Sequence, residues 1–447
     1  MDDAAYDRWL SDLDARRVLL AELTHADGIE YVATNPYASL PSDSDPNRIY
    51  DDCLQSAVDI STRIDGLIGF GEVSLIDDGS ITSWVNNKWQ GHPITLFLGG
   101  PDWPRDDFRQ LAIGVNGGVI DASRGTLTFA MNDQSTALEE PIDTGQLPDE
   151  AGPVPLALGS VFNAPAYLLT ASPYEFKASF LACTALTPKD NGNPVAHTDN
   201  LSNGSFELSN ALVGTLTVDI EEQHNTPQLI AEWVAAQYGI TVSSIAMPAY
   251  TVGLYYNSEV TGKQILDELC NGMGAYWYLD SLGQLVMQQH TAPGAADVTL
   301  VSDEILQDQI QLSSTEQPWK SLTLRLRRNY SVLSTVAGAV SASQSARLSR
   351  EWNEVRGTQA ATGYPLAQTV IRDTCIQLQV DAQTERDRLL ALRAVRRDRY
   401  TLDAFLPPVT VGQNLVVIHP RLEGKKGRII SVSRSPTRGA TNIEVWV

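Results

Sequence analysis

Cysteine is scarce in this 447-residue sequence, and its four cysteines stand far apart. Cys53, Cys183, Cys270 and Cys375 are separated by 130, 87 and 105 positions. This spacing resembles neither a disulfide framework nor a pair of CxxC metal-ligand motifs. We therefore expect buried free thiols, no disulfide and no structural metal.

The sequence also lacks the motifs by which enzymes of this size are usually identified. Its six histidines share no HxxxH, HxH or HExxH spacing, and no GxxxxGK[ST] loop is present. The glycine-rich segment 69–74 has Ser74 where a dinucleotide-binding loop needs its third glycine. Asp43 begins an imitation of a calcium loop, but Arg48 stands at the sixth position, where glycine is needed. The sequence predicts no catalytic residue, no cofactor and no metal.

Long apolar runs are missing as well. The most apolar stretch, residues 154–171, is interrupted by Pro155, Asn163 and Pro165, and a membrane-spanning helix needs about 20 apolar residues. The first residues lack the basic and apolar regions of a secretory signal. We expect a soluble protein that is made in the cytosol.

Basic residues are few, with 32 Lys and Arg against 54 Asp and Glu and a net charge of −22. This balance disfavours binding of DNA or anionic lipid through phosphate neutralisation. The charge is uneven, because residues 1–150, 151–317 and 318–447 carry −18, −14 and +10. A protein partner is therefore the better target for the basic C-terminal third.

The composition predicts the fold class. A 43% hydrophobic and 19% charged chain with 32 Gly and 23 Pro is typical of an ordered, turn-rich protein. We predict a mainly β fold with α+β insertions, in which several antiparallel barrel-like or sandwich-like modules join a few helices. The predicted divisions are an N-terminal helix (1–16), an acidic β domain (17–150), a β domain (151–225), a helix-helix-hairpin module (226–296) and a basic β domain (297–447).

Several local elements can be read from the sequence. Asp27-Gly28 predicts a hairpin between residues 17–24 and 29–34. Thr226-Pro227 and the Thr261/Gln264 capping box predict two helix starts, and a hairpin is predicted over 275–288.

Two further segments allow predictions. Core packing is the favoured interpretation of Trp84 and Trp89, over stacking on a ligand. The Ala/Ser-rich residues 334–347 predict a flexible loop or insertion.

A longer helix is predicted over residues 381–399, with Leu389, Leu392 and Val395 facing inward. Its outward arginines are the candidate interface between domains or subunits, although single surface ion pairs contribute only about 0–1 kcal/mol each. These arginines are Arg386, Arg393, Arg396 and Arg397.

Several segments together resemble one family, the hub or tip proteins in the baseplate of long-tailed, non-contractile (siphovirus-type) bacteriophages. The first is a P-x-x-x-G-x-V-x-N segment at residues 155–163. The others are residues 201–208, 214–219, 252–256, 265–269, 274–279, 283–285, 381–386 and 411–418.

The resemblance implies a non-enzymatic, ring-forming virion protein, commonly a homo-trimer, that joins the tail tube to the tip complex. Its ring would surround the channel for the tape-measure protein and DNA during genome ejection. The implied partners are the distal tail, tape-measure and tip or fibre proteins, and assembly would take place in the bacterial cytoplasm. The sequence departs from the family in its Ala/Ser insertion and in lacking the clustered cysteines that hold an iron–sulfur centre in some relatives.

Two alternatives stay open. One is a carbohydrate-binding module or a glycosidase that uses the nine tryptophans and the abundant carboxylates. The other is a distal tail protein that forms a hexameric ring. An enzyme would act as a monomer with a cleft lined by Trp and paired carboxylates, whereas the two ring proteins differ in subunit number.

Overall fold

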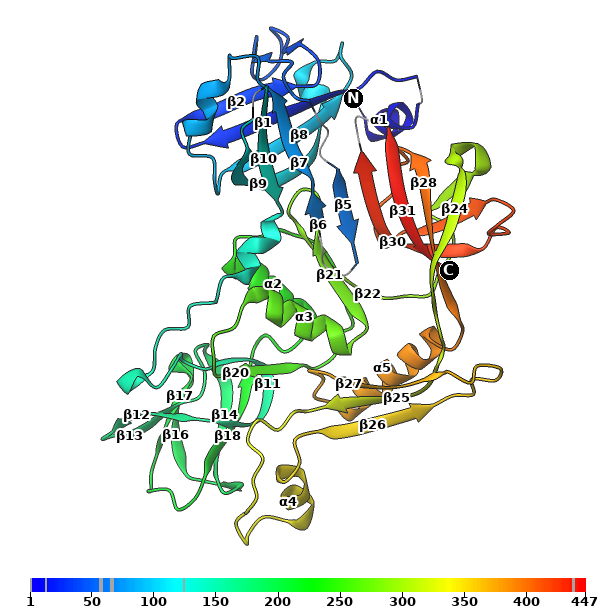
Figure 1. Ribbon diagram of the computed structural model, residues 1–447. Helices are drawn as coiled ribbons and strands as arrows, with labels where there is room; N and C mark the ends of the chain where they lie inside the picture. The colour runs from blue at the N-terminus through cyan, green and yellow to red at the C-terminus, as the bar shows by residue number, and fades with distance from the viewer. Residues whose placement is uncertain (1, 13, 56–58, 65–67, 124, 436–438) are drawn as a thin grey trace.

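The computed structural model describes residues 2–12, 14–55, 59–64, 68–123, 125–435 and 439–447 (Figure 1). These residues form seven β-sheets and five α-helices. Two large curled sheets occupy the upper part of Figure 1, and smaller sheets and helices lie below them. The prediction of a mainly β chain with several antiparallel modules and α+β parts is confirmed. None of the described helices is both long and apolar enough to cross a membrane.

The N-terminal sheet is antiparallel and has the order β2-β1-β8-β9-β10-β7. Its first hairpin, β1 (Val18–His25) and β2 (Gly28–Ala33), confirms the one predicted around Asp27-Gly28. Strand β1 is almost continuously buried because Leu19 enters one apolar cluster and Leu20 another on the opposite face. The other strands are β7 (Glu72–Ile76), β8 (Pro93–Gly99), β9 (Arg109–Asp121) and β10 (Thr126–Asn132), and β3 (Tyr37–Ala38) pairs with β4 (Ile49–Tyr50).

Trp89 belongs to the core of this N-terminal sheet. It is 2% exposed, its Nε1 donates to the Trp84 carbonyl at 2.7 Å, and its ring meets Phe129 edge-on. The core-packing interpretation is confirmed for Trp89, and Trp84 packs half-buried against the same cluster. Helix α1 (Asp3–Leu10) begins at an Asp2 cap and is shorter than the predicted helix over 1–16.

The C-terminal sheet has the order β23-β29-β30-β31-β28-β24, and two N-terminal strands extend it. Strand β5 (Ile60–Arg63) pairs with β30, and β6 (Ile68–Phe70) pairs with β5, so blue and red ribbons lie side by side in Figure 1. This pairing joins a strand of the predicted domain 17–150 to a strand of the predicted domain 297–447. The bounds of these domains stay predictions. The remaining strands are β23 (Val298–Val301), β24 (Ile305–Glu316), β28 (Arg397–Phe405), β29 (Asn414–Ile418), β30 (Lys426–Ser435) and β31 (Ala440–Trp446).

Two sheets in the lower left of Figure 1 share one apolar cluster, which contains Phe176, Phe206 and Val218. Their orders are β15-β14-β18-β11-β20 and β12-β13-β17-β16. Strands of the first are β11 (Leu156–Pro165), β14 (Cys183–Asp190), β15 (Asn193–Pro194), β18 (Leu216–Glu222) and β20 (Gly253–Tyr256). Strands of the second are β12 (Tyr167–Ala171), β13 (Tyr174–Lys177), β16 (His197–Asn200) and β17 (Ser205–Leu208).

Helices α2 (Pro227–Gln237) and α3 (Gly262–Gly272) begin where the sequence predicts. The Thr226 hydroxyl accepts from the Leu229 amide at 3.3 Å, and Thr261 and Gln264 form the expected capping box. The predicted hairpin is confirmed as β21 (Ala275–Leu279) and β22 (Leu285–Gln289), with β19 (Val242–Ala246) parallel to β22.

Hairpin β21–β22 is buried on both faces. Trp277 and Met287 enter the cluster that α2 and α3 share with α5, whereas Tyr278 and Val286 enter the core of the C-terminal sheet. Successive side chains of a strand point to opposite faces, so one hairpin closes two cores. The hairpin therefore attaches the C-terminal sheet to the helical module.

Helix α5 (Gln379–Leu392) covers the sheet β26-β25-β27 at the lower right of Figure 1. The predicted helix over 381–399 is wrong at its C-terminal end, because residues from Arg397 onward form β28. A tertiary contact ends the helix, since the Arg393 carbonyl accepts from the Trp319 amide at 2.9 Å instead of from a later residue of the helix. Val395, which was predicted to face inward, is 50% exposed. The strands are β25 (Trp319–Leu326), β26 (Asn353–Thr358) and β27 (Gln368–Asp373).

The predicted flexible loop over 334–347 needs a correction, because its end forms helix α4 (Ala342–Leu348). Ser341 and Gln344 make a capping box, and Leu348 is buried. Six short 3₁₀ helices complete the described elements: η1 (Thr82–Asn86), η2 (Arg105–Asp107), η3 (Gln134–Glu139), η4 (Pro148–Glu150), η5 (Leu201–Asn203) and η6 (Ser302–Glu304).

Candidate functional site in an arginine-rich pocket

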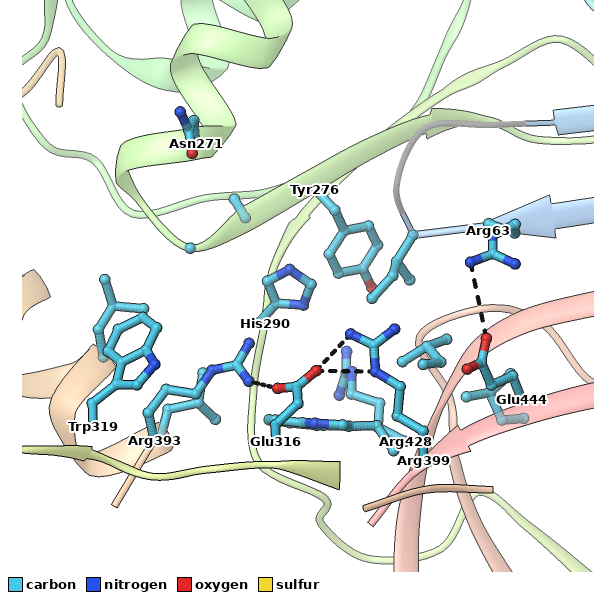
Figure 2. A pocket seen from close by; sticks show the side chains of 18 of the residues that line it. Arg63, Asn271, Tyr276, His290, Glu316, Trp319, Arg393, Arg399, Arg428 and Glu444 are labelled. Atoms are coloured by element: carbon cyan, nitrogen blue, oxygen red, sulfur yellow. Dashed lines mark hydrogen bonds and ion pairs between the residues drawn. The ribbon is translucent and has the colours of Figure 1, made fainter. Parts of the chain in front are cut away.

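A pocket of about 400 Å³ lies where hairpin β21–β22, helix α5 and the C-terminal sheet meet (Figure 2). Among the described residues, five arginines and two glutamates line it, so three more positive than negative side chains converge in a chain that is acidic overall. They come from separate elements: Arg63 (β5), Arg372 (β27), Arg393 (after α5), Arg399 (β28), Arg428 (β30), Glu316 (β24) and Glu444 (β31).

Glu316 is the central carboxylate of the pocket (Figure 2). One of its oxygens accepts from Arg399 Nε at 3.0 Å and Nη2 at 2.6 Å, and the other accepts from Arg393 Nη1. Burial alone would raise the pKa of Glu316, but Arg393 and Arg399 outweigh burial and lower that pKa. Glu316 is therefore an ionised acceptor held between two guanidinium groups.

Two tryptophans cover the Arg393 guanidinium. Its central carbon lies 5.0 Å from the Trp446 ring centroid and 5.5 Å from that of Trp319. Arg372 lies 5.1 Å from the same Trp319 ring. These cation–π contacts hold the side chains in place without neutralising them.

Arg372 and Arg428 have no carboxylate within 4.0 Å in the part of the chain that the structure describes. Arg372 donates to the Asn271 carbonyl at 3.0 Å, and Arg428 donates to the Thr291 hydroxyl at 2.6 Å. The Arg428 Nε is buried and has no acceptor among the described residues. Burial and the neighbouring Arg393 lower the pKa of Arg372.

His290 lines the pocket as a neutral side chain. Burial lowers its pKa to about 3, and the positive charges of Arg393, Arg388, Arg372 and Arg428 add to the effect. The imidazole therefore adds no positive charge to the site near neutral pH.

A buried ion pair fixes α5 beside the pocket. Glu385 is fully buried and accepts from Arg388 at 2.6 and 2.9 Å. Arg388 also donates to the carbonyls of His290 at 2.6 Å and Met273 at 3.0 Å. These hydrogen bonds tie the helix to the strand and helix ends that form one wall of the pocket.

The four arginines predicted as an interface lie on different elements. Arg386 lies on α5, Arg393 caps its end, Arg396 lies in the connection and Arg397 begins β28, so the expectation that one helix presents all four is wrong. Only Arg393 lines the pocket. The ion-pair partners are Asp387 for Arg386, Glu316 for Arg393 and Asp398 for Arg396, all within the C-terminal third. Their role at an interface stays a prediction.

The chemistry of the pocket favours binding of anions. Guanidinium groups match the oxygen geometry of phosphates and carboxylates, and no group of three or more metal-ligating side chains exists among the described residues. Burial raises the pKa of Cys53 to about 11 and of Cys183 to about 12, so both thiols stay protonated at neutral pH.

Most residues of this site carry no signal in the sequence. Arg63, Arg372 and Arg428 belong to strands far apart in the sequence, and none stands in a distinctive motif. The one available signal was the charge of +10 on residues 318–447.

No protein-family model matches the sequence, and no curated protein is similar to it. Among solved structures, the 43 kDa tail protein of prophage MuSo2 from Shewanella oneidensis is 13% identical, with a TM-score of 0.46 over 96% of this chain and 98% of that one. The tail protein from Neisseria meningitidis is 9% identical, with a TM-score of 0.45 over 96% of both chains. Prophage tail protein gp18 from Listeria monocytogenes is 10% identical, with a TM-score of 0.44 over 96% of this chain and 94% of that one. All three are described as tail proteins.

Proposed function

We propose that this protein is a structural subunit of a phage tail baseplate, a hub ring that joins the tail tube to the tip or fibre complex. The observation that carries the proposal is how the segments of the resemblance assemble. Strand β11 holds the first segment and pairs with β18 on one side and β20 on the other, and both strands hold further segments. Parts of α3, β21 and α5 join β11 and β20 in one apolar cluster. The segments of the resemblance therefore lie in paired strands and in one apolar core, as expected of a protein whose role is structural.

The first segment of the resemblance has backbone roles that few residue types can fill. Gly159 has a φ of +71°, and a Cβ there would lie 2.3 Å from the Val252 carbonyl oxygen. Asn163 is buried at a φ of 54°, and its Nδ2 donates to Asn329 at 2.8 Å. Val161 fills the core between them. The pattern therefore supports a bent strand rather than chemistry.

Two curled sheets in one chain support a ring. Curled sheets that are repeated around an axis enclose a channel, because strand twist curves each sheet. A homo-trimer would supply six such walls, and its channel would pass the tape-measure protein and DNA. A net charge of −22 suits this role, since acidic walls repel the phosphate backbone and let DNA slide.

The proposal includes the neighbours of the ring. Distal tail, tape-measure and tip or fibre proteins would contact it in the virion tail, after assembly in the host cytoplasm. Of the four predicted interface arginines, Arg396 is the best placed to contact another subunit, because its side chain is 47% exposed.

A carbohydrate-active protein is the first alternative, and the pocket contains the tryptophans and two carboxylates that it would need. However, a glycosidase acid needs a raised pKa, whereas Arg393 and Arg399 lower the pKa of Glu316. Arginines also lie over the Trp319 and Trp446 rings that would stack on a sugar. The pocket therefore favours the structural role.

Native mass spectrometry of the purified protein tests the proposal. We expect a species of three chains of 48.7 kDa each. Six chains would favour the distal tail ring. Monomers at micromolar concentration, together with no ring of this protein in assembled tails, would contradict both the hub and the distal tail ring hypotheses. Hydrolysis of a glycan would favour the enzyme.

Ring assembly should also depend on salt if charged surfaces orient the subunits. Arg396→Glu should slow assembly at low ionic strength, and molar salt should slow that of the wild type. Arg48→Glu is the control, because Arg48 pairs locally with Asp45. Equal assembly rates for both variants at all salt concentrations would show that Arg396 does not take part in the interface.

A further inference from the structure

The arginine-rich pocket holds more positive charge than the described residues around it neutralise. Glu316 is shared between Arg393 and Arg399, and Arg63 reaches Glu444 at 4.0 Å. Arg372 and Arg428 are left with neutral acceptors only, among the described residues. Like charges held close together in a partly buried site repel one another more strongly than in water.

The two arginines without a carboxylate partner among the described residues come from different sides of the pocket. Arg372 enters from the sheet under α5, and Arg428 enters from the C-terminal sheet, where its Nε–H has no acceptor among the described residues. A single guanidinium can be satisfied by a monovalent ion. Two that face one space from separate sheets favour one compact anion with several charged oxygens.

The size of the space agrees with a small ligand. A volume of about 400 Å³ lies within the usual range of about 300–1,000 Å³ for small-molecule sites. The rings of Trp319, Trp446 and Tyr276 form part of the wall, which limits water around the arginines and strengthens their attraction for an anion.

We infer that this pocket binds a compact multivalent oxyanion of the phosphate class, which bridges Arg372 and Arg428 beside the Glu316 cluster. The bound ion joins the sheet under α5 to the C-terminal sheet and hairpin β21–β22. Its binding therefore stabilises the junction of these modules. Anion binding does not depend on whether the chain forms a ring.

Isothermal titration of the full-length protein with inorganic pyrophosphate tests the inference, with inorganic phosphate and sodium chloride at matched ionic strength for comparison. We expect one saturable pyrophosphate site per chain, weaker phosphate binding and no saturable effect of chloride. The unfolding temperature should rise with pyrophosphate in parallel. Absence of saturable binding up to millimolar pyrophosphate would overturn the inference.

Two variants locate the site. Arg372→Gln and Arg428→Gln each remove a cation that has no carboxylate partner, and each should weaken pyrophosphate binding at least tenfold. Both should also leave the ligand-free unfolding temperature unchanged or raised, because repulsion in the pocket decreases. Arg48→Gln is the control, because Arg48 directly precedes β4 and does not line the pocket, and this variant should bind like the wild type. Unchanged affinity in both pocket variants would mean that the anion binds elsewhere and would overturn the assignment.

Hydrogen–deuterium exchange on the wild type decides the matter if a variant does not fold. Pyrophosphate should slow exchange in residues 271–276, 368–373 and 426–432, which surround the pocket. Protection only in other segments would refute the site.

Discussion

Replacing Glu385 by glutamine should destabilise the junction between α5 and hairpin β21–β22 by about 3 kcal/mol. The buried carboxylate accepts from Arg388 at 2.6 and 2.9 Å, from Gln289 at 3.1 Å and from Tyr250 at 3.3 Å. Removing one partner of a buried ion pair costs about 3–5 kcal/mol, because the other charge loses its counter-ion. Arg388 keeps 26% exposure and two carbonyl acceptors, so the lower end of that range applies.

The assay has to be local, because a chain with several cores need not unfold in one step. Hydrogen–deuterium exchange should accelerate in residues 379–392 and 285–290. A loss of about 3 kcal/mol corresponds to roughly a 150-fold faster exchange where local opening controls it. The thermal transition of this module should fall by roughly 6–12 °C if it unfolds as a unit of 150–250 residues.

Asp387→Asn is the matched control on the same helix. The Asp387 side chain is 65% exposed and pairs with Arg386, so its loss should cost at most about 1 kcal/mol. If Glu385→Gln and Asp387→Asn exchanged at equal rates in both segments, the buried pair would contribute nothing and the reasoning would be refuted.

Three further outcomes can be measured on single variants. Gly253→Ala should lose about 3 kcal/mol by urea denaturation, because its Cβ would lie 1.7 Å from the Ser160 carbonyl oxygen, whereas Gly338→Ala meets nothing within 4 Å and should stay within about 0.5 kcal/mol of wild type. Asn163→Ala should lower the free energy of unfolding by about 1–3 kcal/mol in the same assay, since Asn329 loses a buried partner. An unchanged urea midpoint would mean that the Asn163–Asn329 hydrogen bond does not stabilise the fold. The pKa of His290 in the folded state is lowered to about 3, so the neutral imidazole contributes to stability fully above about pH 6.5 and loses that contribution as the pH falls toward 3. The loss is at most about 1.4 kcal/mol per pH unit. In acid titrations of unfolding free energy, His290→Gln should reduce this slope.

The sequence was most informative where neighbouring residues determine the structure. The starts of α2 and α3 depend on Thr226 and on Thr261 with Gln264, whose hydrogen bonds close within one turn. The end of α5 depends on residues that lie elsewhere. Glu316, which binds Arg393, is 77 positions away in the sequence. The residues next to Arg393 therefore contain no pattern that predicts the end of the helix.

The pocket could not be predicted for the same reason. Arg63, Arg372 and Arg428 lie in strands of ordinary composition, and only the pairing of β5 with β30 and the packing of a second sheet bring them together. Arg393 was selected as an exposed interface residue, yet it lies under Trp446 and contributes to the pocket. A surplus of basic residues in one region signals a charged site but not its location.

The pairing of β5 with β30 has a consequence for the order in which the protein can be made. Ser435 donates to Asp59 across 376 positions of sequence. At about 5–20 residues per second on the ribosome, roughly 20–75 s pass between synthesis of the two strands. During that time β5 has only β6 to pair with, although the Ile60 side chain already belongs to the core of the N-terminal sheet. The N-terminal sheet can form early, but β5 cannot complete its pairing until β30 has left the ribosome, so a strand made much later decides when this early part of the chain is complete.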